Sequence, residues 1–277
     1  MGQRILIGLI VLAGAIALVR YTACNKPTIV PPPQGDGRPA RVSEPTTAPA
    51  RTVDDMPRAS NPAVAAAIDE LLAAWDQVPS VYAAVATFMP SAAGNKGQTV
   101  GVGQYYLQKR DGKVLIDFEL KNKLRIVQED LTKLITGELL VWIIDGDYLY
   151  TFTNQPGFIQ AAKKKLDYNA VLLIGGRPLF RDLIADNKLS LQSEEMLDGR
   201  AVRVILAEPN DGALKTRHYF DKATGIRLKM EETDADGKST LRITLSDLDL
   251  ASSISDERFK FTVPAGVTFV DETAQTP

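Results

Sequence analysis

Five Asp-Gly pairs recur along this chain from residue 111 onward, mostly between runs in which apolar and polar residues alternate. Tight hairpin turns that match the twist of β-strands require positive φ, which Asp-Gly adopts readily. Strands joined by such turns are antiparallel neighbours. The sequence therefore predicts a large antiparallel meander, to which Gly225 in "DKATGIRL" adds a glycine-bulge turn. The pairs are Asp111-Gly112, Asp145-Gly146, Asp198-Gly199, Asp211-Gly212 and Asp236-Gly237.

The runs that flank these turns are the predicted strands. We expect three hairpins, "TVGVGQYYLQ" with "KVLIDFEL", "ELLVWII" with "DYLYTF", and "LSLQSEEM" with "AVRVILAE". Three further strands follow, "TRHYFD", "IRLKMEET" and "TLRITLSDLDL". The paired carboxylates in these runs, at 194–195 and 231–232, are interpreted as solvated strand residues.

The hairpin "LLVWIIDGDYLYTF" is apolar on both faces, which predicts burial on both sides. A one-residue slip would change which side chains meet, so the inward face stays open. For a two-residue turn, Val141, Ile143, Tyr148, Tyr150 and Phe152 share one face, and Leu140, Trp142, Ile144 and Leu149 share the other. Such a hairpin fits a curved sheet with an apolar inner surface and a partly covered outer surface.

Helical spacing appears first at residues 61–78, "NPAVAAAIDELLAAWDQV", with Asn61 as N-cap and Pro62 at the first helical position. Its apolar stripe comprises Val64, Ile68, Leu71, Leu72, Trp75 and Val78. Trp75 either covers a sheet or belongs to a lid that moves over a ligand. Further helices are predicted at 129–136, around 158–166 and at 177–186, either across the open side of the sheet or outside it.

The chain ends in "FKFTVPAGVTFVD", residues 259–271, where alternation continues on both sides of a Pro-Ala-Gly corner. As strands, Phe259, Phe261 and Val263 share one face before the corner, and Val267 and Phe269 share one after it.

The first residues are typical of export. Arg4 precedes an apolar run, residues 5–19, that is short for a membrane span, and Ala23 directly precedes Cys24. This junction resembles the lipobox of bacterial lipoproteins, in which the cysteine is acylated, although Arg20 and Tyr21 depart from that pattern. An uncleaved membrane anchor and a secreted, cleaved form are the alternatives. Residues 25–60 are rich in Pro, Thr and Ala and predict a disordered tether, so the expected division is 1–24, 25–60 and 61–277.

Charge and residue usage argue against several functions. A net charge of −2 and a pI near 5.6 provide no basic surface for nucleic acid. His218 is the only histidine and Cys24 the only cysteine, so no familiar metal site or Cys-His pair can be assembled. His218 is interpreted as a surface or edge strand residue, and "GKST" lacks the first glycine of a phosphate loop. We expect no enzyme activity, metal or cofactor.

Taken in order, an N-terminal helix, the "DGDYLYTF" hairpin, "YFDKATGIRLKM" and the terminal motif resemble the outer-membrane lipoprotein carrier and sorting family of the LolA and LolB type. The resemblance covers about residues 61–273. It implies a mainly β (α+β) fold, in which a large curved antiparallel sheet forms an incomplete barrel and amphipathic helices cover its open side. The terminal motif would close the sheet edge. Its matching residues are Phe259, Phe261, Pro264, Gly266, Val267 and Asp271.

The resemblance also implies a function, namely binding the acyl chains of lipoproteins or lipids for sorting or transfer, by a monomer on the periplasmic side of the cell envelope. An envelope-stress regulator and a structural lipoprotein with a filled interior are the alternatives. Family carriers hold their lid helices with an arginine on an early strand, where this chain has Asp117 and Glu119. The expected ligand-binding residues are Leu71, Leu72, Trp75, Val141, Trp142, Ile143, Tyr148, Tyr150, Phe152 and Phe180.

Overall fold

The computed structural model describes residues 56–89, 98–122, 126–128, 131–133, 138–155, 158–166, 174–210 and 214–274. Residues Pro57–Pro277 form one compact unit. Cys24, the apolar run at 5–19 and nearly all of the predicted tether lie outside the described residues, as does the pair Asp211-Gly212.

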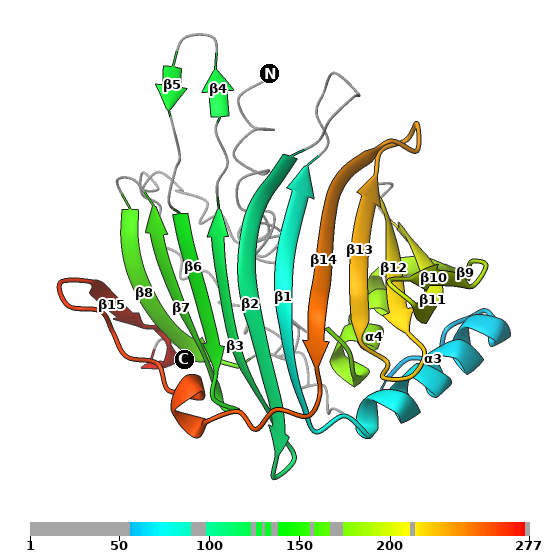
Figure 1. Ribbon diagram of the computed structural model, residues 1–277, viewed down its shortest axis with the longest axis horizontal. Helices are drawn as coiled ribbons and strands as arrows, with labels where there is room; N and C mark the ends of the chain where they lie inside the picture. Colours follow the sequence, from blue (N-terminus) through cyan, green and yellow to red (C-terminus); the bar gives the residue numbers. More distant parts are fainter. Residues whose placement is uncertain are drawn as a thin grey trace, which may run out of the picture. The chain divides into compact units, whose positions relative to one another are not determined.

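The described part of the chain contains one main sheet of thirteen strands (Figure 1). Its order is β10-β11-β12-β13-β14-β1-β2-β3-β6-β7-β8-β15, and β9 also pairs with β11. The strands are β1 (Ser80–Met89), β2 (Gln98–Arg110), β3 (Lys113–Asn122), β6 (Glu138–Ile144), β7 (Tyr148–Gln155), β8 (Phe158–Lys165), β9 (Asn187–Leu191), β10 (Glu195–Leu197), β11 (Arg200–Pro209), β12 (Lys215–Asp221), β13 (Arg227–Thr233), β14 (Ser239–Asp249) and β15 (Thr268–Asp271).

The sheet is curved and its strand order does not close on itself, which confirms the predicted fold class (Figure 1). Every pairing is antiparallel except that of β15 with β8. Two hairpin turns have the expected geometry, because both residues of Asp111-Gly112 and of Asp198-Gly199 have positive φ. At the pairs 145–146 and 236–237 only the glycine has positive φ. All the strand pairs predicted from alternation are present.

The register defines two faces of the sheet. We call inner the face that carries Ala83, Tyr105, Phe118 and Trp142, which lie directly opposite one another on β1, β2, β3 and β6. The outer face carries the neighbouring row Tyr82, Tyr106, Asp117, Ile143 and Tyr150. The two rows differ by one residue in every strand from β1 to β6, as the pleat requires.

Helix α3 (Pro62–Asp76) begins as predicted, with the Asn61 side chain accepting a hydrogen bond from the Ala63 backbone N–H at 2.9 Å. It packs on the inner side of the sheet. The Lys109 ammonium lies 4.1 Å from the centre of the Trp75 ring, and Lys109 shares the face of Tyr105 and Leu107. α3 also lies close to Gly225, between β12 and β13, since a Cβ there would lie 2.1 Å from the Leu71 carbonyl oxygen and 3.0 Å from Trp75.

Helix α4 (Arg177–Asp186) spans the predicted residues, and the Phe180 ring lies 4.9 Å from the Phe220 ring of β12. Its start is adjacent to α3, since a Cβ at Gly175 or Gly176 would meet the Trp75 indole within 3 Å. In Figure 1 both helices lie at the β9 to β13 end of the sheet. Whether α3 moves as a lid stays a prediction.

Two other predicted helices are wrong. Residues 129–136 overlap a short hairpin of β4 (Ile126–Gln128) and β5 (Leu131–Lys133), and the region 158–166 forms β8. Eight residues are too few to hold a helix without a packing face. "FIQAAKKK" contains helix-forming residues, but the free edge of β7 offers it a full ladder of hydrogen bonds.

The C-terminal segment differs from its prediction before the corner. Phe259 ends a 3-10 helix, η1 (Asp256–Phe259), so Phe259, Phe261 and Val263 do not share a strand face. The corner itself is present, because Gly266 has φ of 77° and the Val267 N–H donates to the Pro264 carbonyl at 3.2 Å. β15 then pairs with β8 at the end of the sheet order, as the edge role implies, although in parallel.

Candidate functional site

The inner face of β2, β3 and β6 carries a row of three aromatic side chains. The ring centres of Tyr105 and Phe118 are 6.3 Å apart and those of Phe118 and Trp142 are 6.2 Å apart. Tyr105 and Phe118 are almost fully buried, whereas Trp142 is half-buried. Their tilted and edge-on arrangement is the one that aromatic rings prefer. We call these residues the aromatic row.

Aliphatic side chains surround the aromatic row on the same face. Between Ile116 and Leu120, Leu140 and Ile144, and Leu149 and Thr153, every inner-face residue is aliphatic, aromatic or threonine. Gly103 on β2 leaves no room for a side chain, because a Cβ there would lie 1.8 Å from the Glu119 carbonyl oxygen. The buried aliphatic residues of this surface are Leu107, Ile116, Leu120, Leu140, Ile144 and Leu149.

The structure places the predicted ligand-binding residues in three groups. Leu71, Leu72 and Trp75 of α3 and Phe180 of α4 are buried where these helices pack. Trp142 belongs to the aromatic row. The remaining five lie on the outer face, and these are Val141, Ile143, Tyr148, Tyr150 and Phe152.

The outer-face group is partly covered from within the chain. The Phe261 ring stacks on Tyr150 at 5.4 Å, and the Lys163 ammonium lies 3.8 Å from the centre of the Tyr148 ring. Burial, together with the nearby Asp145 carboxylate, raises the pKa of Tyr150 to about 12. Of the residues matching the terminal motif, Phe259 is buried, Pro264, Gly266 and Val267 form the corner, and Asp271 accepts hydrogen bonds from Thr273.

An ion pair fastens this C-terminal segment to the outer face. The Arg258 guanidinium donates to Asp117 at 2.9 Å and lies 3.7 Å from the centre of the Tyr106 ring. Asp117 is 8% exposed, and this burial raises its pKa against the opposing influence of Arg258. Asp117 therefore lies on the outer face and holds the C-terminal segment there.

A polar cluster of Tyr105, His218 and Arg227 lies at the Tyr105 end of the aromatic row. An Arg227 nitrogen is 3.3 Å from His218 Nδ1. Arg227 and Tyr105 are close enough that each affects the pKa of the other. Burial, and then the charge of Arg227, lower the pKa of His218. The prediction that His218 lies at a surface or edge is wrong, because β12 is flanked by β11 and β13.

Arg227 was missed by sequence reasoning. Tyr219 pairs with Lys229 but Phe220 pairs with Arg227, so an irregularity turns Arg227 to the face of His218. The Gly225 turn signal could have suggested a bulge, but not its register. The prediction that Glu231 and Glu232 are solvated is also wrong, since both are buried and Glu231 pairs with Lys229 and Arg242. Glu194 and Glu195 are exposed as predicted.

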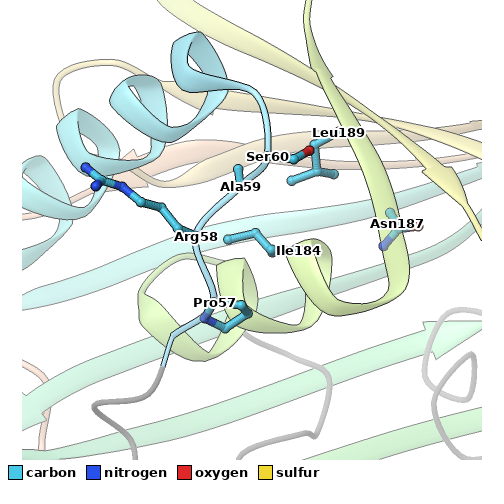
Figure 2. A pocket seen from close by; sticks show the side chains of 7 residues that line it. All are labelled: Pro57, Arg58, Ala59, Ser60, Ile184, Asn187 and Leu189. Carbon is cyan, nitrogen blue, oxygen red and sulfur yellow. The ribbon is translucent and has the colours of Figure 1, made fainter.

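A separate pocket of about 270 Å³ lies beside α4 (Figure 2). Residues 57–60 form one wall, and Ile184, Asn187 and Leu189 form the rest. This pocket is smaller than most ligand sites and contains none of the predicted residues. Among the described residues, no group of three His, Cys, Asp or Glu side chains could hold a metal ion. In that same part of the chain, no helix has the length and apolar character needed to cross a membrane.

Comparison with known proteins finds solved structures of similar fold. No protein-family model matches the chain, and no curated protein matches its sequence. A complex of MucA and MucB from Pseudomonas aeruginosa matches with 16% identity, 71% of this chain and 61% of that one covered, and a TM-score of 0.42. The chain likewise spans 64% of the length of MucB in a second crystal structure.

Two further structures are a lipoprotein and a protein described as a member of the LolA superfamily. The lipoprotein LppX of Mycobacterium tuberculosis matches with 13% identity over 71% of this chain and 100% of its own, at a TM-score of 0.37. A LolA superfamily protein from Nitrosomonas europaea matches with 12% identity over 70% and 97%, at a TM-score of 0.28. All of these identities and TM-scores are low, so the function is argued from this chain's own residues.

Proposed function

We propose that this protein binds acyl chains of lipoproteins or lipids on the inner face of its sheet, without catalysing a reaction. The observation that supports this best is the aromatic row with its surrounding aliphatic residues, which together form an uncharged surface across β3, β6 and β7 that continues to Tyr105 and Leu107 of β2. Removing an acyl chain from water contributes about 0.8 kcal/mol per buried methylene. Several chains would then bind well without any specific polar contact, so recognition would be broad.

The cellular setting follows from the N-terminal prediction. If Cys24 is acylated and residues 25–60 are extended, the domain would reach up to about 100 Å from the membrane, at about 3.1 Å per residue. Such a protein acts as an anchored acceptor, or passes its cargo on within the reach of its tether. We propose the periplasmic side of the cell envelope as its location and a monomer as its working form.

One observation favours the alternative, a regulator or structural lipoprotein with a filled interior. Phe118 is 4% exposed and Leu120 is fully buried, as expected if the inner face is ordinary core. A core and a ligand site use the same apolar residues, so the two functions differ in whether lipid enters.

Native mass spectrometry with lipid extraction of the exported full-length protein separates them. We expect acyl lipid or lipopeptide to co-purify, and a Trp142→Lys variant to lose at least about tenfold of it, because a charge on the inner face costs over 1.4 kcal/mol. Val141→Lys is the matched control. Val141 directly precedes Trp142, lies on the outer face and is paired with Glu119 of β3.

Both variants must keep the circular dichroism spectrum and melting behaviour of the parent protein. If Trp142→Lys does not fold, a photoreactive aromatic residue at Trp142 should crosslink to lipid in cells, whereas one at Val141 should not. A parent protein that stays empty and also fails to bind added lipopeptide would exclude acyl-chain binding.

A further inference from the structure

The polar cluster at the end of the aromatic row is placed where a bound amphiphile would present its head group. Tyr105 belongs both to the row and to the cluster, and it lies two strands from Trp142 on the same face. An acyl chain lying along Trp142, Phe118 and Tyr105 would therefore end next to Arg227. This argument rests on the proposed function, which supplies the acyl chain.

Arg227 is the cation of this cluster. A guanidinium can only donate hydrogen bonds, so His218 Nδ1 must accept in their 3.3 Å contact. His218 is thereby held as a neutral imidazole, in agreement with its lowered pKa. Burial also lowers the pKa of Arg227, to about 10, which leaves it charged near neutral pH.

The surroundings hold Arg227 in place. Its backbone N–H donates to the Ile174 carbonyl, and the Ile174 backbone also hydrogen-bonds to Tyr105. Directly after Ile174, Gly175 and Gly176 pack against the Trp75 indole. Arg227 remains half-buried rather than fully enclosed. A guanidinium held in position is suited to planar, two-point recognition of a carboxylate or phosphate.

We propose that Arg227, oriented by His218 and assisted by the Tyr105 hydroxyl, binds the anionic head group of the acyl ligand. The ligand class is an anionic amphiphile, with a carboxylate in a fatty acid or a phosphate in a phospholipid. A neutral amphiphile with the same chain would gain the apolar contacts and lack the charge-assisted hydrogen bonds.

The test compares oleate, oleyl phosphate and oleyl alcohol by calorimetric titration of the full-length protein after removal of co-purified lipid. We expect the parent protein to bind at least one of the two anions about tenfold or more tightly than the alcohol. Arg227→Met should abolish that preference and change the affinity for the alcohol by less than about threefold, because only the charge-assisted hydrogen bonds are lost. The relative affinities for oleate and oleyl phosphate identify the head group.

Arg242→Met is the matched control, because Arg242 lies on the outer face of the neighbouring strand and pairs with Glu231 at 2.9 Å. It should leave the preference unchanged. Equal affinity of the parent protein for all three amphiphiles, or a preference that survives in Arg227→Met, would overturn the inference. Failure of all three to bind would instead count against acyl-chain binding itself. If Arg227→Met does not fold, the preference of the parent protein and its weakening in Arg227→Lys decide.

Discussion

At the scale of single residues, Gly225 shows how conformation and packing can demand the same residue. Its φ is 67°, in the left-handed region, and a Cβ there would lie 2.1 Å from the Leu71 carbonyl oxygen. The clash could not be relieved by a change of side-chain rotamer in α3, because the nearest atom belongs to the backbone. Gly225 therefore sets how closely α3 approaches the turn between β12 and β13.

We predict that Gly225→Ala destabilises the protein by about 3 kcal/mol or more, since backbone strain and overpacking add together. Gly237→Ala is the control, because Gly237 has φ of 77° but nothing within 4 Å of its Cβ position. Its cost should be about 1 kcal/mol. Chemical denaturation of both variants gives the two free energies of unfolding, and equal losses would contradict close packing of α3 at Gly225.

At the scale of elements, η1 and β15 show how the outer face is covered. The ion pair of Arg258 with Asp117 and the stacking of Phe261 on Tyr150 hold the segment before β15 reaches β8. Arg110 also donates to Asp256 at 2.8 Å at the start of η1. These contacts make a four-residue parallel strand possible at the sheet edge.

We predict that Arg258→Gln costs about 2 kcal/mol near neutral pH, because it leaves a buried carboxylate without its cation. Burial raises the pKa of Asp117 above its unfolded value, so protonation favours the folded state. The contribution of this group is present below the unfolded pKa and is lost as pH rises through the folded pKa. Without Arg258 the folded pKa of Asp117 rises further. The destabilisation caused by Arg258→Gln should therefore be larger at about pH 7 than at about pH 4.

Denaturant unfolding of the parent protein and Arg258→Gln at both pH values measures this difference. In the Asp117→Asn background the pH dependence of the Arg258→Gln effect should largely disappear. That result would assign the pH dependence to Asp117 and not to the nearby ion pair of Arg110 with Asp256. A loss that is the same at both pH values would show that Arg258 acts through packing on Tyr106 alone.

The elements that sequence reasoning predicted well are those decided locally. Asp-Gly turns and Pro178 in α4 act through the φ preferences of single residues, and the Asn61 cap acts through a hydrogen bond to Ala63 two residues away. Their hairpins and helices were therefore found with nearly correct bounds. β8 was missed although its partner β7 directly precedes it, because "FIQAAKKK" consists mostly of residues that also form helices. The segment around Phe259 was wrong for a different reason, since its partners Asp117, Tyr106 and Tyr150 on the outer face lie far away in the chain. Such partners are invisible to local periodicity.

At the scale of the whole molecule, the untested prediction is membrane attachment through Cys24. We expect intact-mass analysis of the mature protein to show acylation at an N-terminal Cys24. The Cys24→Ala variant should lack the mass of the acyl groups. The reason is the apolar run at 5–19 followed by Ala23 and Cys24. An unmodified chain that retains residues 1–23 would show an uncleaved anchor, and an unmodified chain beginning near Cys24 would show secretion.

The sequence by itself determined that this chain is an antiparallel meander containing a hairpin with two apolar faces, and it located two of the four helices that it predicted, at 61–78 and 177–186. Turn chemistry and periodicity could do this because they act between residues close in the chain. The sequence also identified Trp142 as a ligand-binding candidate, but could not separate it from Tyr150. Only the tertiary structure decided which face is inner, that Arg227 turns toward it, and that β15 adds in parallel. Each of these depends on register between strands, and a shift of one residue reverses the face of every side chain.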